Sequence, residues 1–263
     1  MELLDRPLVA PERKVSGYRP LKLLHHFGKL IEDKEDTEQV FHIIEASKGR
    51  KSHQQAWDFI KSPDGQRFLH EGTDIPSMLD DHERWADLPA NSVGKRYMAF
   101  MRREGLSAAG LVEESHKWVP PESRPEDLTE WYFNRLRDTH DLFHVLTGYG
   151  RDALGEGALL GFSYSQSYNK GILFIAYMGA RLMKKVSGTN APLYSAIREG
   201  QRLGRAAAKL AHMDVEAVMR EDIDEARKRL NIGEPVIYRQ CLEMLAREGI
   251  DPADLSLSSA QPA

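Results

Sequence analysis

Two histidines and two carboxylates in the middle of the chain have the types and spacing of metal ligands: His140, Asp141, His144 and Glu156. The histidines are four residues apart, so on a helix their imidazoles share one face, one turn apart. Asp141 lies about 100° around the axis from His140 and can bind the same ion, or hold a ligating water or a histidine ring. Two neutral imidazoles with one or two carboxylates suit Zn²⁺, with Fe²⁺ or Mn²⁺ as weaker candidates, and leave coordination positions open for water or substrate. We therefore predict one divalent-metal site of the catalytic kind.

The two histidines also fit a role in the core. A His-x-x-x-His pair is common on helices, so two hydrogen-bonded core histidines are the alternative to a metal site. The His-Glu-x-x-His motif of metalloproteases is absent, because residue 141 is Asp. A phosphohydrolase with an adjacent His-Asp pair needs a further His upstream and an Asp downstream, and His116 and Asp152 could serve. That assignment gives His144 and Glu156 no role.

The hydrophobic pattern around these residues is helical, and no alternating segment is long enough to predict a strand. We expect an all-α fold, a single helical domain of two packed sub-bundles. The division falls at residues 119–125, where three prolines in seven residues forbid a helix. The expected organisation is a flexible N-terminal extension over residues 1–19, an all-α domain over residues 20–250 with sub-bundles at about 20–118 and 126–250, and a disordered tail over residues 251–263.

Two of the expected helices carry the candidate ligands. The pattern predicts one long helix over residues 126–146, which contains both histidines and ends at Gly148 and Gly150. The next predicted helix spans residues 152–168 and contains Glu156. A chain that turns at the glycines can lay this second helix antiparallel to the first. Such a turn would bring the Glu156 carboxylate back toward the histidine face.

Composition excludes several classes of function. With 36 basic and 40 acidic side chains, well mixed along the sequence, the net charge of −4 gives no electrostatic reason to expect nucleic acid as a partner. Cys241 is the only cysteine, so no disulfide can form within the chain. Its apolar neighbours in a helical pattern predict a small buried side chain rather than a catalytic thiol.

No segment predicts a targeting signal or a membrane span. The first twenty residues contain Glu2 and Asp5 and no apolar core segment, unlike a secretory signal or an Arg-rich transit peptide. The longest apolar-leaning run, residues 171–183, is too short to span a bilayer and is followed by Lys184 and Lys185. We expect a soluble protein with at most peripheral membrane contact.

The spacing of the candidate ligands resembles a known family signature. Residues 140–144 read His-Asp-Leu-Phe-His, and Glu156 follows after eleven residues, as in the HDxxH-x11-E signature of the ubiquinone (coenzyme Q) biosynthesis protein family known as Coq-four. Two further segments are similar to blocks of that family: VGKRYMAFM over residues 93–101 and IDEARKRLNIG over residues 223–233. The resemblance covers about residues 20–235. Because no transit peptide is recognised, it points to a bacterial homologue.

The resemblance implies an all-helical protein with zinc held by His140, Asp141, His144 and Glu156, which would also be its catalytic residues. Members of the family have been described as an enzyme that replaces the C1 carboxylate of a polyprenylated 4-hydroxybenzoate-type intermediate with a hydroxyl, a metal-dependent oxidative decarboxylation. They have also been described as a non-catalytic, lipid-binding scaffold of the biosynthetic complex. The implied partners are the polyprenylated precursor and other ubiquinone biosynthesis proteins, with a homodimer as an option. The implied location is the cytoplasm, with peripheral contact to the inner face of the membrane.

The chemistry of the predicted site is consistent with the enzymatic role. A metal ion beside a substrate carboxylate can stabilise the charge that develops as CO₂ leaves. The oxidation requires O₂ or another electron acceptor, and no flavin or haem motif is present. A polyprenyl tail also needs an apolar channel, and residues 155–183 are apolar nearly all round, although an ordinary buried helix pair has the same pattern. The side chains expected to line such a channel are Leu159, Leu160, Phe162, Phe174, Tyr177 and Met178.

Overall fold

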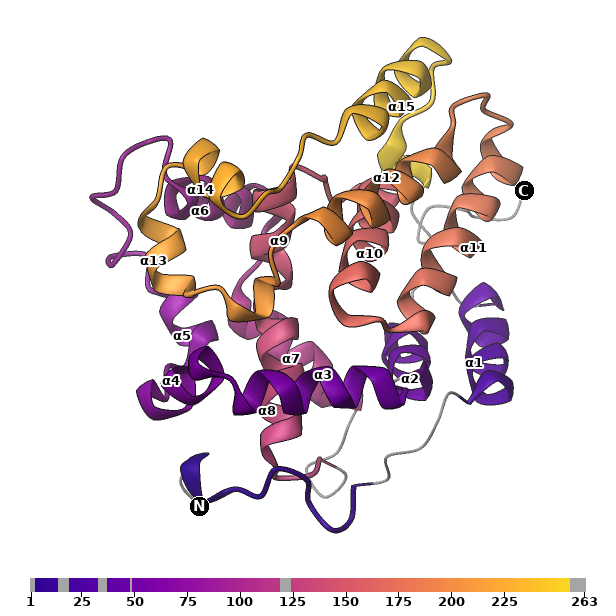
Figure 1. The fold of residues 1–263 in the computed structure, drawn as a ribbon. Coiled ribbons are helices and arrows are strands. Elements are labelled where there is room, and N and C mark those ends of the chain that lie inside the picture. Colours follow the sequence, from indigo (N-terminus) through magenta and orange to yellow (C-terminus); the bar gives the residue numbers. More distant parts are fainter. Residues whose placement is uncertain (1–2, 14–18, 33–36, 48, 119–123, 256–263) are drawn as a thin grey trace. The chain divides into compact units, whose positions relative to one another are not determined.

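The computed structural model describes residues 3–13, 19–32, 37–47, 49–118 and 124–255 (Figure 1). Within these ranges the elements are helices joined by turns, and β-type pairing is limited to an isolated antiparallel bridge between Ser92 and Asp222. The expected all-α fold is confirmed. Among the described helices, none has the length and hydropathy needed to cross a bilayer.

The helices form two compact units, each assembled from three stretches of the chain. The first unit contains Met1–Ser16, Arg50–Leu146 and Lys209–Leu230. The second unit contains Gly17–Gly49, Thr147–Ala208 and Asn231–Ala263. Helices are thus grouped by the packing of their apolar faces and not by their order along the chain.

The proline-rich segment does not separate these two units. Helix α7 (Ala108–Trp118) before it and helix α8 (Leu128–Asp138) after it pack against each other inside the first unit. The units therefore differ from the sub-bundles expected at 20–118 and 126–250. Residues 119–123 of the expected linker lie outside the described ranges.

The first unit has an aromatic core. The Phe59 ring centroid lies 5.3 Å from that of Tyr132 and 5.8 Å from that of the partly buried Trp131, and Phe68 and Leu69 belong to the same buried cluster. Large rings of this kind bury much apolar surface per residue, which stabilises a unit made of short helices. The other helices of this unit are η1 (Leu3–Asp5), α3 (Arg50–Lys61), α4 (Pro63–Glu71), α5 (Ile75–Asp80), α6 (Val93–Glu104), α9 (His140–Thr147), η3 (Leu210–His212), α13 (Val215–Arg220) and α14 (Ile223–Arg229).

The N-terminal residues of the described chain are bound to the start of α8. The amide of Leu128 donates to the carbonyl of Pro7 at 2.9 Å. Asp127, the fully buried N-cap of α8, accepts the Ala10 amide at 2.8 Å and forms an ion pair with Arg13. A flexible extension over residues 1–19 therefore does not describe residues 3–13. A buried capping carboxylate needs such partners, because it would otherwise be an unpaired buried charge.

The helix expected over residues 126–146 is interrupted at Thr139, so α8 ends there and α9 starts at the next residue. Thr139 is buried, and its hydroxyl donates to the carbonyl of Arg135 at 2.8 Å. A threonine that bonds back to the preceding turn competes with the backbone ladder and bends a helix. The kink leaves both predicted histidines on one short helix, α9.

The second unit is built from longer helices in close contact: α1 (Pro20–Glu32), α2 (Thr37–Ser47), α10 (Ala153–Ser167), α11 (Lys170–Ser187), α12 (Leu193–Ala206), α15 (Val236–Arg247) and η4 (Pro252–Leu255). Helices α10 and α12 approach through glycine: a Cβ at Gly200 would lie 2.2 Å from the carbonyl oxygen of Ala158. A side chain cannot occupy that position without moving the helices apart.

The C-terminal part of the second unit confirms the prediction made for Cys241. Cys241 on α15 is fully buried, as predicted. Burial raises the pKa of the Cys241 thiol to about 11, so it is a neutral core group at physiological pH. The expectation of a disordered tail over residues 251–263 does not describe η4, which is a short helix in contact with α10 and α11. Residues 256–263 lie outside the described ranges.

Candidate metal centre

Helix α9 positions the candidate ligands of the first unit. It begins directly after Thr139, whose carbonyl accepts the Phe143 amide at 3.2 Å. Leu142 and Leu146 are completely buried, which anchors the apolar side of the helix. Gly148 follows the last helical residue with φ +77°, a left-handed conformation that glycine adopts without strain.

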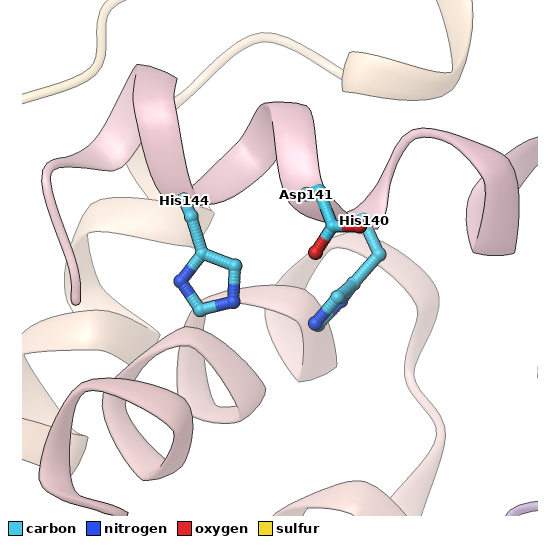
Figure 2. A group of neighbouring side chains, drawn as sticks. All are labelled: His140, Asp141 and His144. Atoms are coloured by element: carbon cyan, nitrogen blue, oxygen red, sulfur yellow. The ribbon is translucent and has the colours of Figure 1, made fainter. Parts of the chain in front are cut away.

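Three polar side chains converge on one side of α9. One ligand atom from each of His140, Asp141 and His144 lies within 4.8 Å of the other two, and Figure 2 shows the three side chains projecting to the same side of the helix. The two imidazole rings have centroids 5.1 Å apart and planes at 90°. Asp141 and His144 are buried, while His140 is partly exposed.

This donor set fits a divalent metal ion. Two nitrogens and a carboxylate oxygen are ligands that Zn²⁺ prefers. Ligand atoms that share one ion at about 2.1 Å lie at most about 4.2 Å apart, so small side-chain rotations bring the observed 4.8 Å spacing into coordination range. The pair of histidines on one helix face is confirmed, and the role as metal ligands stays a prediction.

Helix α6 supplies two buried aromatic residues at this cluster. The Phe100 ring stacks on His144, with centroids 5.5 Å apart and planes inclined by 23°. Tyr97 is 2% exposed, and its hydroxyl has no hydrogen-bond partner among the described residues. Burial and the nearby charge of Asp141 raise the pKa of Tyr97, so the phenol keeps its proton at neutral pH. A buried hydroxyl without a partner in the protein is uncommon, so the Tyr97 hydroxyl is able to donate to a molecule bound beside the cluster.

Arg227 on α14 holds the other end of α9. Its Nε donates to the carbonyl of Leu146 at 2.8 Å, and a terminal nitrogen donates to the carbonyl of Val145 at 3.2 Å. The last carbonyls of a helix have no partner within the helix, and a positive charge there is also favourable. Arg227 therefore positions the helix that carries the cluster.

Helices α6 and α14 lie side by side (Figure 1), so two distant segments of the sequence support α9 together. The amide of Val93 donates to the carbonyl of Glu221, and the amide of Ile223 donates to the carbonyl of Asn91, each at 2.9 Å. A Cβ at Gly94 would lie 2.9 Å from the carbonyl oxygen of Met219 on α13, so the approach of α6 to α13 requires glycine.

Tyr97, Phe100 and Arg227 lie in sequence blocks that resemble the family, but the sequence assigns them no role. A stacking ring, a single tyrosine and a capping arginine have no spacing that separates them from ordinary core or surface residues. Only the long-range contacts show what these side chains do.

The model of the family described as Coenzyme Q (ubiquinone) biosynthesis protein Coq4 matches residues 31–236, most of the 263 residues of the chain. The chain belongs to the Coq4 family. This match confirms the family that the signature around His140 and the two flanking blocks indicated.

Coq4 relatives from fungi share about a quarter of their aligned residues with this chain. The proteins named "Ubiquinone biosynthesis protein coq4, mitochondrial" of Aspergillus clavatus and Penicillium rubens are 26% and 27% identical to it over 191 residues. Each alignment covers 72% of this chain and 63% of the relative. The chain thus spans less than two thirds of the length of the curated relatives it matches.

The fold of this chain is also similar to that of a solved structure. The chain is similar to the crystal structure of a candidate ubiquinone biosynthesis protein from Nostoc punctiforme PCC 73102, with a TM-score of 0.58 and 20% identity. The alignment covers 82% of this chain and 100% of that chain. At this identity the likeness concerns the fold.

Glu156, the last residue of the Coq4-like signature, belongs to the second unit. It lies in the first turn of α10, is partly exposed, and its Oε1 is 3.3 Å from the Nε of Arg151. Asp152 caps this helix by accepting the amides of Leu154 at 3.2 Å and Gly155 at 3.0 Å. The structure brings together the three ligand candidates of α9, and Glu156 as a fourth ligand stays a prediction.

The six residues expected to line a prenyl channel all lie in the second unit and fall into two groups. Leu159 and Phe162 are completely buried in its core. The other four are partly exposed: Leu160, Phe174, Tyr177 and Met178. Leu160 and Phe174 pack on the buried cluster around Leu23 and Ile43. A channel formed by these residues stays a prediction.

Proposed function

We propose that this chain acts in ubiquinone biosynthesis as a metal-dependent enzyme, which replaces the C1 carboxylate of a polyprenylated 4-hydroxybenzoate-type intermediate with a hydroxyl. The convergence of two imidazoles and a carboxylate on α9, within 4.8 Å of one another, carries the proposal. Membership of the Coq4 family supports the pathway. His140, Asp141 and His144 would hold Zn²⁺, with Fe²⁺ or Mn²⁺ less favoured and Glu156 as a fourth ligand.

The residues around the cluster have complementary tasks in this reaction. A bound divalent ion would act as a Lewis acid for the substrate carboxylate. The Tyr97 hydroxyl, which keeps its proton, would donate to an anionic oxygen of the substrate ring. Phe100 fixes the ring of His144 and excludes water from its stacked face. Arg227 holds α9 at its end, which keeps the ligands in register.

The electron balance of the reaction sets one further requirement. The bond from the ring to the carboxylate carbon breaks, CO₂ leaves, and a ring carbon–oxygen bond forms. This exchange removes two electrons from the substrate. Either O₂ takes them and supplies the hydroxyl oxygen, or another external two-electron acceptor takes them and water supplies that oxygen. The residues described above would bind the substrate, orient it and protonate it.

A non-catalytic scaffold that binds prenylated intermediates and presents them to other ubiquinone biosynthesis proteins is the second candidate function. The partly exposed apolar side chains of α10 and α11, such as Leu160, Phe174 and Met178, favour it. In that role a metal ion would only hold α9 in shape.

Complementation of a ubiquinone-deficient strain separates the two functions. His140→Ala and Glu156→Ala should fail to restore ubiquinone and should accumulate the carboxylated precursor, with folding checked by circular dichroism. His116→Ala is the matched control, because His116 is an exposed histidine of the first unit and should support normal ubiquinone levels. Normal ubiquinone in both ligand variants would contradict the enzymatic proposal and favour the scaffold.

A further inference from the structure

A cavity of about 560 Å³ opens in the first unit between α4, α5, α8 and α13. None of the three α9 ligand candidates lines it. Its apolar surface comes from the buried side chains of Phe68, Ile75, Met78 and Val215, with the partly exposed Trp131 beside them. A volume in the range of about 300–1,000 Å³ is typical of small-molecule sites.

Arg135 on α8 is the buried charge in the wall of this cavity. It is 6% exposed, and its guanidinium lies over the Phe68 ring, 4.2 Å from the ring centroid. Its Nε donates to the carbonyl of Ala211 at 2.9 Å, and a terminal nitrogen donates to the carbonyl of Met213. Two of the five N–H groups of the guanidinium are thereby used. Among the described residues, no carboxylate lies within 4 Å of it.

The carboxylates at the rim of the cavity already have arginine partners. The pairs are Arg67 with Glu71 (3.1 Å) and with Asp214 (2.7 Å), and Glu216 with Arg84 (2.6 Å) and with Arg220 (3.1 Å). Arg135 is therefore the charge of this region that has no ion-pair partner among the described residues. A buried guanidinium that is held only by carbonyl oxygens loses much of its hydration without a counter-charge.

Arg135 stays charged despite its burial. Desolvation lowers the pKa of Arg135 to about 10, and the charges of Asp214 and Glu71 act in the opposite direction. The group is thus a cation at neutral pH, available to an anion that enters the cavity.

We propose that this cavity binds a small organic monoanion, with its carboxylate on the remaining N–H groups of Arg135 and its apolar body against Met78, Val215 and Trp131. A planar carboxylate matches the fork of a guanidinium. A single negative charge is specified because Glu71 and Asp214 lie close enough to act on Arg135 and would repel a second one. This site is separate from the α9 cluster, so it does not depend on metal or on the proposed reaction.

The test uses three probes of one shape with the full chain: 2-naphthoate, the neutral 2-naphthamide and 2-naphthyl phosphate, each titrated by calorimetry at pH 7.5. We expect saturable one-to-one binding of 2-naphthoate and about 10- to 100-fold weaker binding of 2-naphthamide, as for the loss of a charge-assisted hydrogen bond. The binding of 2-naphthyl phosphate should be weaker by a similar factor, because Glu71 and Asp214 repel its second negative charge. Equal affinity for all three would overturn the proposal, because it would show that the apolar cavity does not discriminate between charged and neutral ligands. No saturable binding of 2-naphthoate would also overturn it and leave Arg135 as a support for the carbonyls of Ala211 and Met213.

Two variants locate the binding site. Arg135→Met removes the charge and should abolish the preference for 2-naphthoate over 2-naphthamide. Because that change also removes two hydrogen bonds to carbonyls, Ala217→Trp tests the site without touching Arg135: Ala217 is exposed at the rim, and a large ring there should block entry and lower the affinity at least about 10-fold. Ala109→Trp is its matched control.

The control is close in structure to the test position. Ala217 and Ala109 are both exposed alanines near a helix start, and each amide donates to an aspartate, Asp214 at 3.0 Å and Asp80 at 2.9 Å. Only Ala217 lines the cavity. Unchanged 2-naphthoate affinity in Ala217→Trp, or an equal loss in Ala109→Trp, would contradict binding in this cavity.

Discussion

The two units both bury polar side chains, but the neighbours of these side chains differ. In the second unit, two of the buried polar side chains serve helix ends: Asn169 caps α11 by accepting the Gly171 amide at 2.9 Å, and Glu199 accepts the Ile237 amide at the start of α15, also at 2.9 Å. In the first unit, three side chains that could ligate a metal ion, His140, Asp141 and His144, converge on one side of α9.

The apolar packing of the two units differs as well. The second unit brings α10 and α12 into near-backbone contact through Gly200, whereas the first packs large rings such as Phe59 and Tyr132. Capping contributes to stability wherever a helix must end. A gathering of titratable groups has no such general benefit, because their burial is costly. The comparison therefore places the three candidate ligands of α9 in the first unit and the near-backbone contact of α10 with α12 in the second.

Removal of a ligand should give the largest effect. His144→Ala is expected to lose bound metal almost completely, measured by atomic emission on protein purified without chelator. His53→Ala is the control, because His53 is also a buried histidine of the first unit but lies outside the cluster. It should keep a stoichiometric metal content. A wild-type metal content near zero would make the α9 histidines core residues and remove the contrast between the units.

The close packing of the second unit predicts a strong response to one methyl group. Gly200→Ala places a Cβ about 2 Å from a carbonyl oxygen and should lower the free energy of unfolding by about 2–3 kcal/mol. Gly179→Ala is the matched control within a helix of the same unit, since nothing lies within 4 Å of its Cβ position. It should raise the free energy of unfolding by about 0.5–1 kcal/mol. Equal midpoints in urea for both variants would show that α10 and α12 are not in near-backbone contact.

The hydroxyl of Tyr97 separates function from stability in the first unit. Tyr97→Phe keeps the ring and removes a buried hydroxyl without a partner among the described residues, so the free energy of unfolding should stay constant or rise by up to about 1 kcal/mol. If the hydroxyl donates to substrate, the rate of ubiquinone formation should fall about 10- to 100-fold with metal content unchanged. Unchanged ubiquinone formation would mean that Tyr97 is a core residue.

The thiol of Cys241 provides the mildest test, which concerns the core of the second unit. With its pKa raised to about 11 by burial, Cys241 should be alkylated by iodoacetamide at pH 8.5 about 100-fold more slowly in the folded chain than in concentrated urea, as followed by mass spectrometry. Because the pKa is higher in the folded state, the contribution of this thiol to stability is complete below its ordinary pKa of about 9 and is lost as the pH rises through 11. Equal alkylation rates would indicate that α15 is loosely packed.

Features that depend on neighbours in the chain could be predicted from the sequence. The i, i+4 spacing of His140 and His144 was enough to place both on one helix face, and the glycine after α9 marks its end. The apolar pattern around Cys241 was enough to predict its burial. Helical periodicity is a local property, because each backbone hydrogen bond joins residues only four apart.

Tertiary structure alone decided which helices meet and which side chains complete the cluster. The kink at Thr139 replaces one expected long helix with α8 and α9. Phe100 stacks on His144 over more than 40 residues of sequence, and Arg227 reaches α9 over more than 80. Such contacts follow from the fit of apolar faces and the need to satisfy buried polar groups, and neither leaves a periodic signal in the chain. The residues that could bind a metal were thus readable from the sequence, whereas the residues that hold them in place emerge only from the packed first unit.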